Sequence, residues 1–328
     1  MLRLGLLFCS RAKGILPKVA MRNTKRFRFK SNMTPSKWIF FASTCLIALC
    51  LYIVFCVYPI IESIRLSFFD WNGYITVEPE FVKFAKYHEV LTDSLFWTSF
   101  KNDLLITAIK EVLICFLTVL FAVSLTRMRM KSGECAAYKF LFYVPNVLSV
   151  VIIGSVWRYI LMPGKQGLLN ALLSIFGKEV NRSWLIVYPI QSIGFVASWC
   201  GVGLFMLTMI AAIKQVPDEL YEAATIDGAG EMKQLQYVTM PAVWLQLTFM
   251  VVSILYQSLG GNFAIVNCFV SMSNSPIADK VTVMGYYVYS KGSSDIGFSY
   301  AASVVMLALT SAISLSVKIA MDKLGEAI

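Results

Sequence analysis

The chain has 328 residues, of which 58% are hydrophobic and only 15% are charged, and its mean hydropathy is +0.68. A soluble domain averages about 45–50% apolar and about 25% charged residues, so this composition excludes an ordinary water-soluble protein and favours a polytopic membrane protein. Collagen-like, coiled-coil and disordered chains are excluded as well. In a soluble protein, a net charge of +10 would suggest binding to nucleic acid. In a membrane protein, the relation of the positive charge to the membrane must be considered first.

Cysteine and histidine usage argues against a disulfide framework and against a metal centre. Most of the eight cysteines stand in apolar runs rather than in outer loops, so a secreted disulfide scaffold is excluded. His88 is the one histidine, and no Cys-x-x-Cys occurs, which argues against a zinc or iron–sulfur site. We therefore expect no metal and no cofactor.

Apolar runs long enough to cross a bilayer recur along the chain. A spanning helix needs about 20 mostly apolar residues, so the sequence predicts an all-α protein with six transmembrane helices. In chain order the predicted spans are Trp38–Ile61, Leu104–Leu125, Phe140–Leu161, Leu185–Ile213, Ala242–Val270 and Phe298–Ile319.

The distribution of basic residues predicts the orientation of these spans. Most of the 29 lysines and arginines fall in the arm before the first span, in the loops after spans two and four, and in the tail, so both termini are expected in the cytoplasm. The basic arm is expected to rest on anionic lipid headgroups rather than on nucleic acid. The predicted organisation is a basic cytoplasmic arm over residues 1–37, a six-helix membrane domain over 38–319 with a cytoplasmic loop at 215–241, and a cytoplasmic tail over 320–328.

Ionisable and polar side chains within the spans are candidates for a solute pathway. Lys110 and Glu111 lie about two turns inside span two, where Lys110 either lines a pathway, extends its ammonium outward, or pairs with a carboxylate of a neighbouring helix. Glu111 is the one carboxylate that the sequence places clearly within a span. Spans four and five add aromatic rings and amides, which suit the faces and hydroxyls of sugars but also serve helix packing: Trp199, Tyr256, Gln257 and Asn262.

The loop between spans four and five predicts a helix–turn–helix knob on the cytoplasmic face. Pro217 suits the first turn of a helix, and the acidic residues after it favour the positive helix end. Gly228 and Gly230 allow a sharp reversal, after which a second helix, Glu231–Val238, is predicted to end before Pro241. An interfacial helix on lipid would carry a basic polar face, so this acidic helix favours a protein partner.

The loop also resembles the coupling-loop motif of ABC importer permeases. The resemblance rests on Glu222-Ala223-Ala224, on Asp227-Gly228-Ala229 and on Pro241, thirteen residues after Gly228. The preceding Val-Pro-Asp-Glu-Leu-Tyr resembles the carbohydrate-uptake branch, and weaker similarities extend over most of the chain beyond the arm. Two departures stand out: Ser271-Met272-Ser273-Asn274-Ser275-Pro276 replaces a Gly-Gly-Pro turn common after span five, and Asp103 replaces a usual Thr.

The resemblance implies the type I fold of ABC importer permeases and a set of partners. These would be a second permease subunit, a dimer of ATP-binding subunits and an extracytoplasmic solute-binding protein. No G-x-x-x-x-G-K-[ST] motif occurs, so the chain is not expected to be an enzyme, and ATP hydrolysis would take place on the separate ATPase. The resemblance assigns coupling to Glu222, Ala223, Ala224, Asp227, Gly228 and Pro241, with Glu222 in a charged pair and Gly228 in the turn.

The sequence thus predicts a permease subunit of an ATP-driven importer for a sugar, oligosaccharide or related solute, located in the cell membrane. An ion-coupled secondary transporter is the main alternative, although membrane carboxylates are few and common carriers of that class have about twice as many spans. A non-transport scaffold is the third alternative, and the sequence offers no sizeable soluble domain in its support.

Overall fold

In the computed structural model, the described residues are 35–74, 76–127, 132–177, 181–271 and 278–327, and they divide into two units. The first unit ends at Pro59, and the second runs from Ile60 to the end of the chain. Most of the predicted basic arm, residues 1–34, lies outside the described residues. So do residues 272–276 of the loop that departs from the family pattern.

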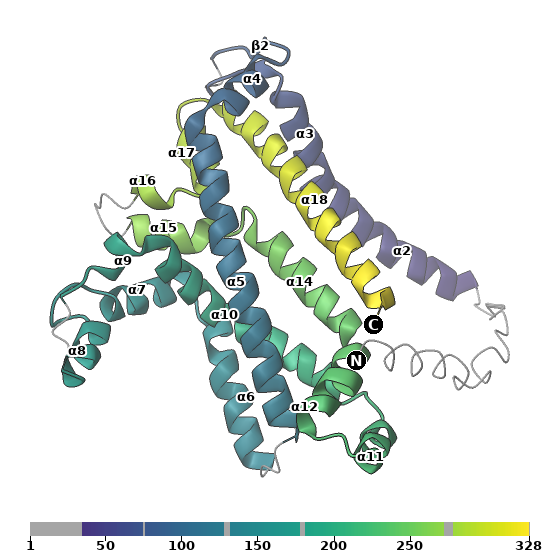
Figure 1. Cartoon of the computed structure of the whole chain (residues 1–328). Coiled ribbons are helices and arrows are strands. Elements are labelled where there is room, and N and C mark those ends of the chain that lie inside the picture. Colours follow the sequence, from purple (N-terminus) through teal and green to yellow (C-terminus); the bar gives the residue numbers. More distant parts are fainter. Residues whose placement is uncertain (1–34, 75, 128–131, 178–180, 272–277, 328) are drawn as a thin grey trace, which may run out of the picture. The chain divides into compact units, whose positions relative to one another are not determined.

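Helices make up most of the described chain, with one two-stranded antiparallel ribbon (Figure 1). In chain order the elements are α2 (Pro35–Tyr52), η1 (Ile53–Val57), α3 (Tyr58–Leu66), β1 (Phe69–Asp70), β2 (Glu80–Phe81), α4 (Ala85–Thr92), α5 (Ser94–Arg127), α6 (Ser132–Val147), α7 (Val150–Ile160), α8 (Leu168–Ile175), α9 (Trp184–Val187), α10 (Pro189–Ile213), α11 (Asp218–Ile226), α12 (Glu231–Gln234), η2 (Leu235–Thr239), α13 (Met240–Ala242), α14 (Trp244–Ser258), α15 (Phe263–Ser271), α16 (Ala278–Val281), α17 (Met284–Gly292) and α18 (Ile296–Ala327).

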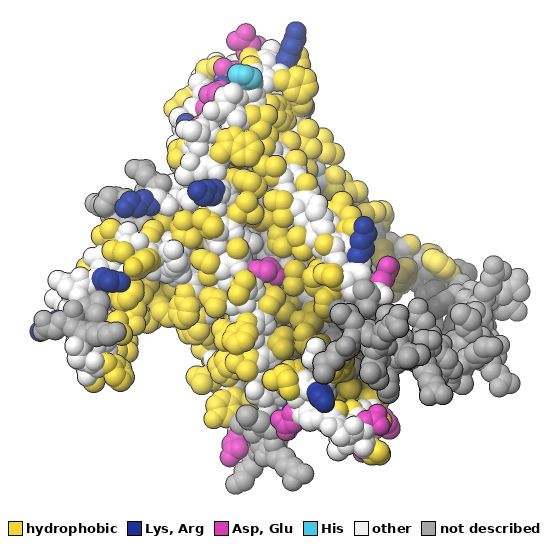
Figure 2. Space-filling view, viewed as in Figure 1, with side chains coloured by type: hydrophobic (Ala, Val, Ile, Leu, Met, Phe, Trp, Pro, Cys, Tyr) yellow, Lys and Arg dark blue, Asp and Glu magenta, His cyan; other side chains and the backbone are white. Residues whose placement is uncertain are grey.

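The predicted all-α membrane fold is confirmed. Among the described residues, four helical stretches are long and apolar enough to cross a bilayer, namely Trp38–Leu66, Ser94–Arg127, Pro189–Ile213 and Ile296–Glu326. Two bent helix pairs bring the number to six if each pair is one span. Figure 2 shows hydrophobic side chains over the middle of the second unit, with charged side chains near the end that carries α4 and near the end that carries α11.

Two of the predicted spans are broken rather than continuous, which corrects the sequence prediction. The third bends by 102° between Val147 and Val150, where Ser149 adopts an extended backbone and its hydroxyl accepts a hydrogen bond from the Val151 N–H, capping α7. The fifth does not run from Ala242 to Val270. It bends by 71° near Val243, and α14 ends at Ser258.

The turn between α14 and α15 owes its shape to glycine. Gly260 has a φ of +90°, a left-handed conformation that side chains with a Cβ adopt at a cost. The turn therefore interrupts the helix in the interior of the second unit and leaves backbone N–H and C=O groups without helical partners. In a membrane interior these groups need hydrogen bonds from elsewhere in the protein.

Helices α5 and α10 form the centre of the second unit, and α6, α14 and α17 pack against them. Apolar side chains form clusters between these helices, with Ile106 and Ile114 of α5 and Met206 and Met209 of α10 fully buried, and buried polar residues of α5 lie beside them. Because lipid tails are as apolar as these side chains, van der Waals packing and hydrogen bonds between helices, rather than the hydrophobic effect, hold such helices together.

Two adjacent polar residues fasten α5 to the segment before α17. The Asn102 side-chain amide donates hydrogen bonds to the carbonyls of Lys280 and Thr282 at 3.3 and 3.0 Å. The Asp103 carboxylate accepts a hydrogen bond from the backbone N–H of Met284, the first residue of α17. Asp103 is fully buried within the long helix α5, so Glu111 is not the one carboxylate inside a span, as the sequence had suggested.

Lys86 holds together the end of the second unit that carries the strand ribbon. Its ammonium lies 2.6 Å from a carboxylate oxygen of Asp295, which precedes α18, and 3.0 Å from one of Asp70 in β1. Burial opposes the charged form, but the hydrogen bonds to Asp295 and Asp70 outweigh it and raise the pKa of Lys86 above its usual value.

Candidate functional site

The predicted knob between spans four and five is present as α11, a glycine turn and α12. Pro217 precedes α11 as its N-cap residue, and Asp218 and Glu219 occupy the first turn, where negative charge favours the helix. After the helix, Gly228 adopts a φ of +76°. The Gly228 N–H donates to the Thr225 carbonyl at 3.0 Å, and the Ala229 N–H donates to the Ala224 carbonyl at 2.9 Å. This pair of bonds is a Schellman motif, which explains the glycine.

The second half of the knob differs from the prediction. Helix α12 is short, and a wider helical turn, η2, continues it into α13, so the chain stays helical through Pro241 instead of ending at Val238. A proline ring clashes with the carbonyl four residues earlier in a regular α-helix, and the wider turn relieves that clash. The helix breaks two residues later, at Val243.

The knob is attached to the end of α5 by Arg127. The guanidinium of Arg127 lies 4.4 Å from the centre of the Tyr221 ring, and its Nη2 donates a hydrogen bond to the Gln234 side-chain oxygen. The Gln234 amide donates in turn to Thr225 Oγ1 at 2.9 Å and to the Ala229 carbonyl at 3.0 Å. These contacts join both helices of the knob to α5.

The predicted coupling residues lie mostly on the surface of the knob. Glu222, Ala223, Asp227 and Gly228 are exposed, whereas Ala224 and Pro241 are half-buried. The apolar side chains of α11 remain largely uncovered, with Ile226 86% and Leu220 50% exposed. The knob therefore presents an uncovered apolar and acidic surface away from the rest of the unit, opposite the end with α4 (Figure 1).

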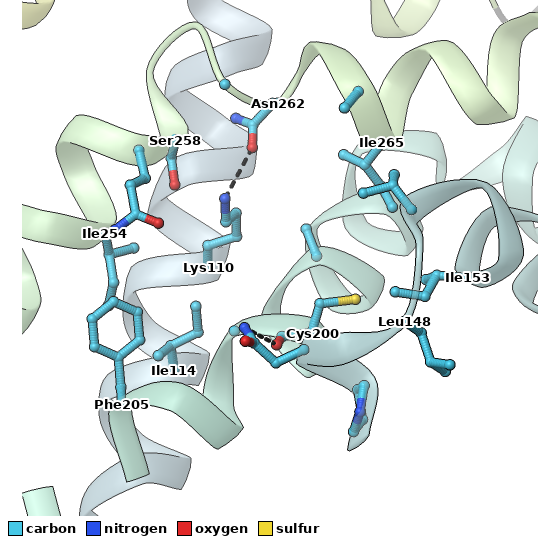
Figure 3. Close-up of a pocket in the computed structure, with 18 residues that line it drawn as sticks. Lys110, Ile114, Leu148, Ile153, Cys200, Phe205, Ile254, Ser258, Asn262 and Ile265 are labelled. Atoms are coloured by element: carbon cyan, nitrogen blue, oxygen red, sulfur yellow. Dashed lines mark hydrogen bonds between the residues drawn. The ribbon is translucent and has the colours of Figure 1, made fainter. Parts of the chain in front are cut away.

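A cavity of about 250 Å³ lies deeper in the second unit, between α5, α6, α7, α10, α14 and α15. Figure 3 shows Lys110, Ser258 and Asn262 at its rim, with apolar walls such as Ile153 and Phe205. The Lys110 ammonium donates a hydrogen bond to Asn262 Oδ1 at 3.1 Å (Figure 3). Two other lining residues are also joined, because the side-chain amide of Asn146 donates a hydrogen bond to the backbone carbonyl of Cys200 at 3.3 Å.

The structure brings two of the four predicted pathway residues to this cavity. Gln257 and Asn262 line it, and both stand at the break between α14 and α15. Trp199 and Tyr256 are outside the lining. The Trp199 ring packs edge-on against Trp157, with 5.5 Å between ring centres, and the Tyr256 side chain is 70% exposed.

Sequence reasoning missed the partner that holds Asn262 in place. Asp103 Oδ1 accepts a hydrogen bond from Asn262 Nδ2 at 2.7 Å, and Asp103 Oδ2 accepts one from the Gly260 N–H at 3.2 Å. Asn262 thus bridges a carboxylate on one side and the Lys110 ammonium on the other. The departure from Thr at position 103 was the available signal, but a pairing 159 residues apart in sequence could not be derived from it.

A family model described as "Binding-protein-dependent transport system inner membrane component" matches residues 119–327. The chain belongs to this family. It is therefore a permease subunit of an ABC importer and a membrane protein, not an enzyme.

Relatives and a solved structure agree with the family. The chain is 29% identical to a probable ABC transporter permease protein, YurN, of Bacillus subtilis, over 80% of this chain and 90% of the relative. It is 29% identical to the arabinooligosaccharides transport system permease protein AraP of Halalkalibacterium halodurans, over 81% and 82%. The fold matches a bacterial alginate ABC transporter solved with its alginate pentasaccharide-bound periplasmic protein, with a TM-score of 0.70 and 20% identity over 87% and 93% of the chains. The expected type I importer fold is confirmed.

Proposed function

We propose that this permease imports a sugar or oligosaccharide and forms half of the membrane pathway, with a second permease chain as the other half. The cavity at the break between α14 and α15 carries the proposal. It combines amides with apolar walls, and at about 250 Å³ it is somewhat smaller than the roughly 300–1,000 Å³ of complete small-molecule pockets, as expected for a half site. Among the relatives, AraP is named for the transport of arabinooligosaccharides.

Energy for the transport comes, in this proposal, from a separate ATPase dimer that receives the knob. The knob offers exposed apolar side chains beside the acidic Glu222, a surface suited to a cleft with basic residues. Closure of the ATPase on ATP would move the knob, and Arg127 would pass the movement to α5, which also carries Lys110 of the cavity. An extracytoplasmic solute-binding protein would deliver the solute, as in the complex with the similar fold.

The experiment that tests the proposal is uptake by the full permease reconstituted with the subunits encoded beside it. Proteoliposomes that contain ATP should accumulate a saccharide delivered by the binding protein, and proteoliposomes without ATP should not. Uptake driven by an ion gradient in the absence of ATP would instead support the secondary-transporter alternative. The control is a preparation with a P-loop lysine variant of the ATPase subunit.

The proposed orientation places both chain termini in the cytoplasm. The indole of Trp244, which follows the knob, donates a hydrogen bond to the Met321 carbonyl near the end of α18, so these segments lie on one side. The start of α18 lies at the other end, where the N–H groups of Ile296 and Gly297 donate to the Trp71 carbonyl. This arrangement agrees with the distribution of basic residues.

Reporter fusions provide the measurement for this orientation. A reporter active only in the cytoplasm should be active when fused after Glu231 or Lys323 and inactive when fused after Glu80 or Ser293. A reporter active only outside the membrane, fused at the same four positions, is the control and should give the opposite pattern. Reversal at two of the four positions would contradict the orientation.

A further inference from the structure

The charge of the cavity is set by a single residue. Of the described residues that line it, Lys110 is the one that carries a formal charge at neutral pH, and none of the others is a carboxylate. The carboxylate of Asp103 is absent from the lining, because its oxygens are turned to the Gly260 N–H, the Asn262 amide and the Met284 N–H. The cavity therefore presents a positive charge without a negative one.

Lys110 also has unused hydrogen-bonding capacity toward the cavity. An ammonium has three N–H donors, and one of them is directed to Asn262 Oδ1. Within the described part of the chain, Lys110 has no carboxylate within ion-pair distance, because Asn262 stands between its ammonium and Asp103. The Asp103 carboxylate, one hydrogen bond beyond Asn262, and the adjacent Glu111 interact with this charge from outside the cavity lining. Charged residues inside a membrane usually serve function.

Ser258 supplies a second, independent indication. Its side chain is fully buried and lines the cavity, and its hydroxyl has no hydrogen-bond partner among the described residues. Figure 3 shows the Ser258 hydroxyl on the same side of the cavity as the Lys110 ammonium, at the end of α14. Buried hydroxyls are generally bonded, so this one has a place for a ligand oxygen.

We propose that the cavity selects saccharides that carry a carboxylate, with the Lys110 ammonium as its charge partner and the Ser258 hydroxyl as a second donor. A carboxylate offers two oxygens to these two donors, and a charge-assisted hydrogen bond is about twice as strong as a neutral one. The amide of Gln257, which also lines the cavity, remains for the hydroxyl groups of the sugar ring. This inference rests on the proposed function, because it names the class of saccharide that the permease transports.

The test compares matched substrates in proteoliposomes that contain the complete importer. The probes are oligosaccharides of galacturonate, mannuronate and glucuronate, each used as the acid and in its carboxyl-reduced, neutral form. The binding protein is the same in every reaction. A change in the preference for acidic over neutral probes between permease variants is therefore caused by the permease. Uptake is divided by the amount of assembled complex, so that a loss of assembly does not count as a loss of selectivity.

The wild-type importer should take up at least one acidic probe faster than its neutral form. In Lys110→Met the preference for the acid should fall by about tenfold or more, the effect of one hydrogen bond to a charged group, while Lys110→Arg retains most of it. Ser258→Ala, which removes no hydrogen bond from the folded chain, should lower the preference by about threefold. Lys101→Met is the matched control, because Lys101 is an exposed lysine on α5 outside the cavity, and it should change nothing.

Three outcomes would overturn the inference. Equal loss of acidic and neutral uptake in Lys110→Met would assign Lys110 to structure alone. If both Lys110→Met and Ser258→Ala keep the wild-type preference for the acidic probe, Lys110 and Ser258 do not bind the carboxylate. ATP-driven uptake of neutral probes without acidic ones would overturn the inference and leave the proposed function intact, whereas the absence of ATP-driven uptake of any saccharide would contradict both.

Discussion

Reversing the charge of Glu222 is expected to abolish ATP-driven uptake while the permease still inserts into the membrane. Glu222 is exposed on α11 and has no ion-pair partner among the described residues, so Glu222→Lys disturbs little within the chain. At the proposed contact with the ATPase it places a cation against a basic surface. Loss of one close interfacial charge pair costs about 2–5 kcal/mol, so uptake should fall by about 30-fold or more.

Co-purification of the ATPase subunit with the tagged permease measures this contact directly. Glu326→Lys is the control, because Glu326 is also exposed and belongs to the end of α18, on the side of the knob in the proposed orientation. This control should retain both the ATPase and uptake. Normal co-purification and normal uptake in Glu222→Lys would show that the knob does not couple through this charge.

The helical segments could be predicted from the sequence because each depends on nearby residues. A bilayer requires long apolar runs, and Trp38–Leu66, Ser94–Arg127, Pro189–Ile213 and Ile296–Glu326 satisfy that requirement without help from the rest of the fold. The turn of the knob was predictable for the same reason. Its Schellman bonds connect residues five or fewer positions apart, and the positive φ needs the glycine at position 228.

The breaks within spans three and five were not predicted because hydrophobicity does not change there. Ser149 caps the start of α7 and Gly260 shapes the turn after α14, and the backbone groups exposed at such breaks are acceptable only because other parts of the fold satisfy them. For Gly260 the acceptor is Asp103, from a helix far away in sequence. In hindsight, the neighbouring Gly260, Gly261 and Asn262 were the local signal for the turn.

The residues of the candidate site, like the helix breaks, could be predicted from the sequence only in part. Amides and aromatic rings in spans four and five were correctly recognised as uncommon in lipid, but composition does not tell which face of a helix they occupy. Gln257 and Asn262 line the cavity, whereas the neighbouring Tyr256 is largely exposed, because adjacent residues of a helix point about 100° apart.

Replacing Asp103 with leucine is expected to destabilise the permease more than any exposed substitution. Asp103 is fully buried and accepts hydrogen bonds from Asn262 Nδ2, from the Gly260 N–H and from the Met284 N–H, which join α5 to the α14–α15 turn and to α17. Leucine leaves these three donors without their acceptor. A hydrogen bond contributes less to stability, on average, in a membrane protein than in the core of a water-soluble protein. We therefore expect the free energy of unfolding to fall by about 2–4 kcal/mol.

Thermal unfolding of the detergent-solubilised full chain provides the measurement. A loss of this size corresponds to a decrease in Tm of about 3–6 °C for a chain of this length. Asp103→Asn keeps one side-chain oxygen as an acceptor, so its Tm should lie between those of the wild type and Asp103→Leu. Asp322→Leu is the control for replacing an aspartate with leucine, because Asp322 is exposed near the end of α18, and its Tm should stay within 1–2 °C of the wild type by the usual effect of surface substitutions. Equal Tm values for Asp103→Leu and Asp322→Leu would mean that packing around Gly260, rather than the carboxylate, holds the turn in place.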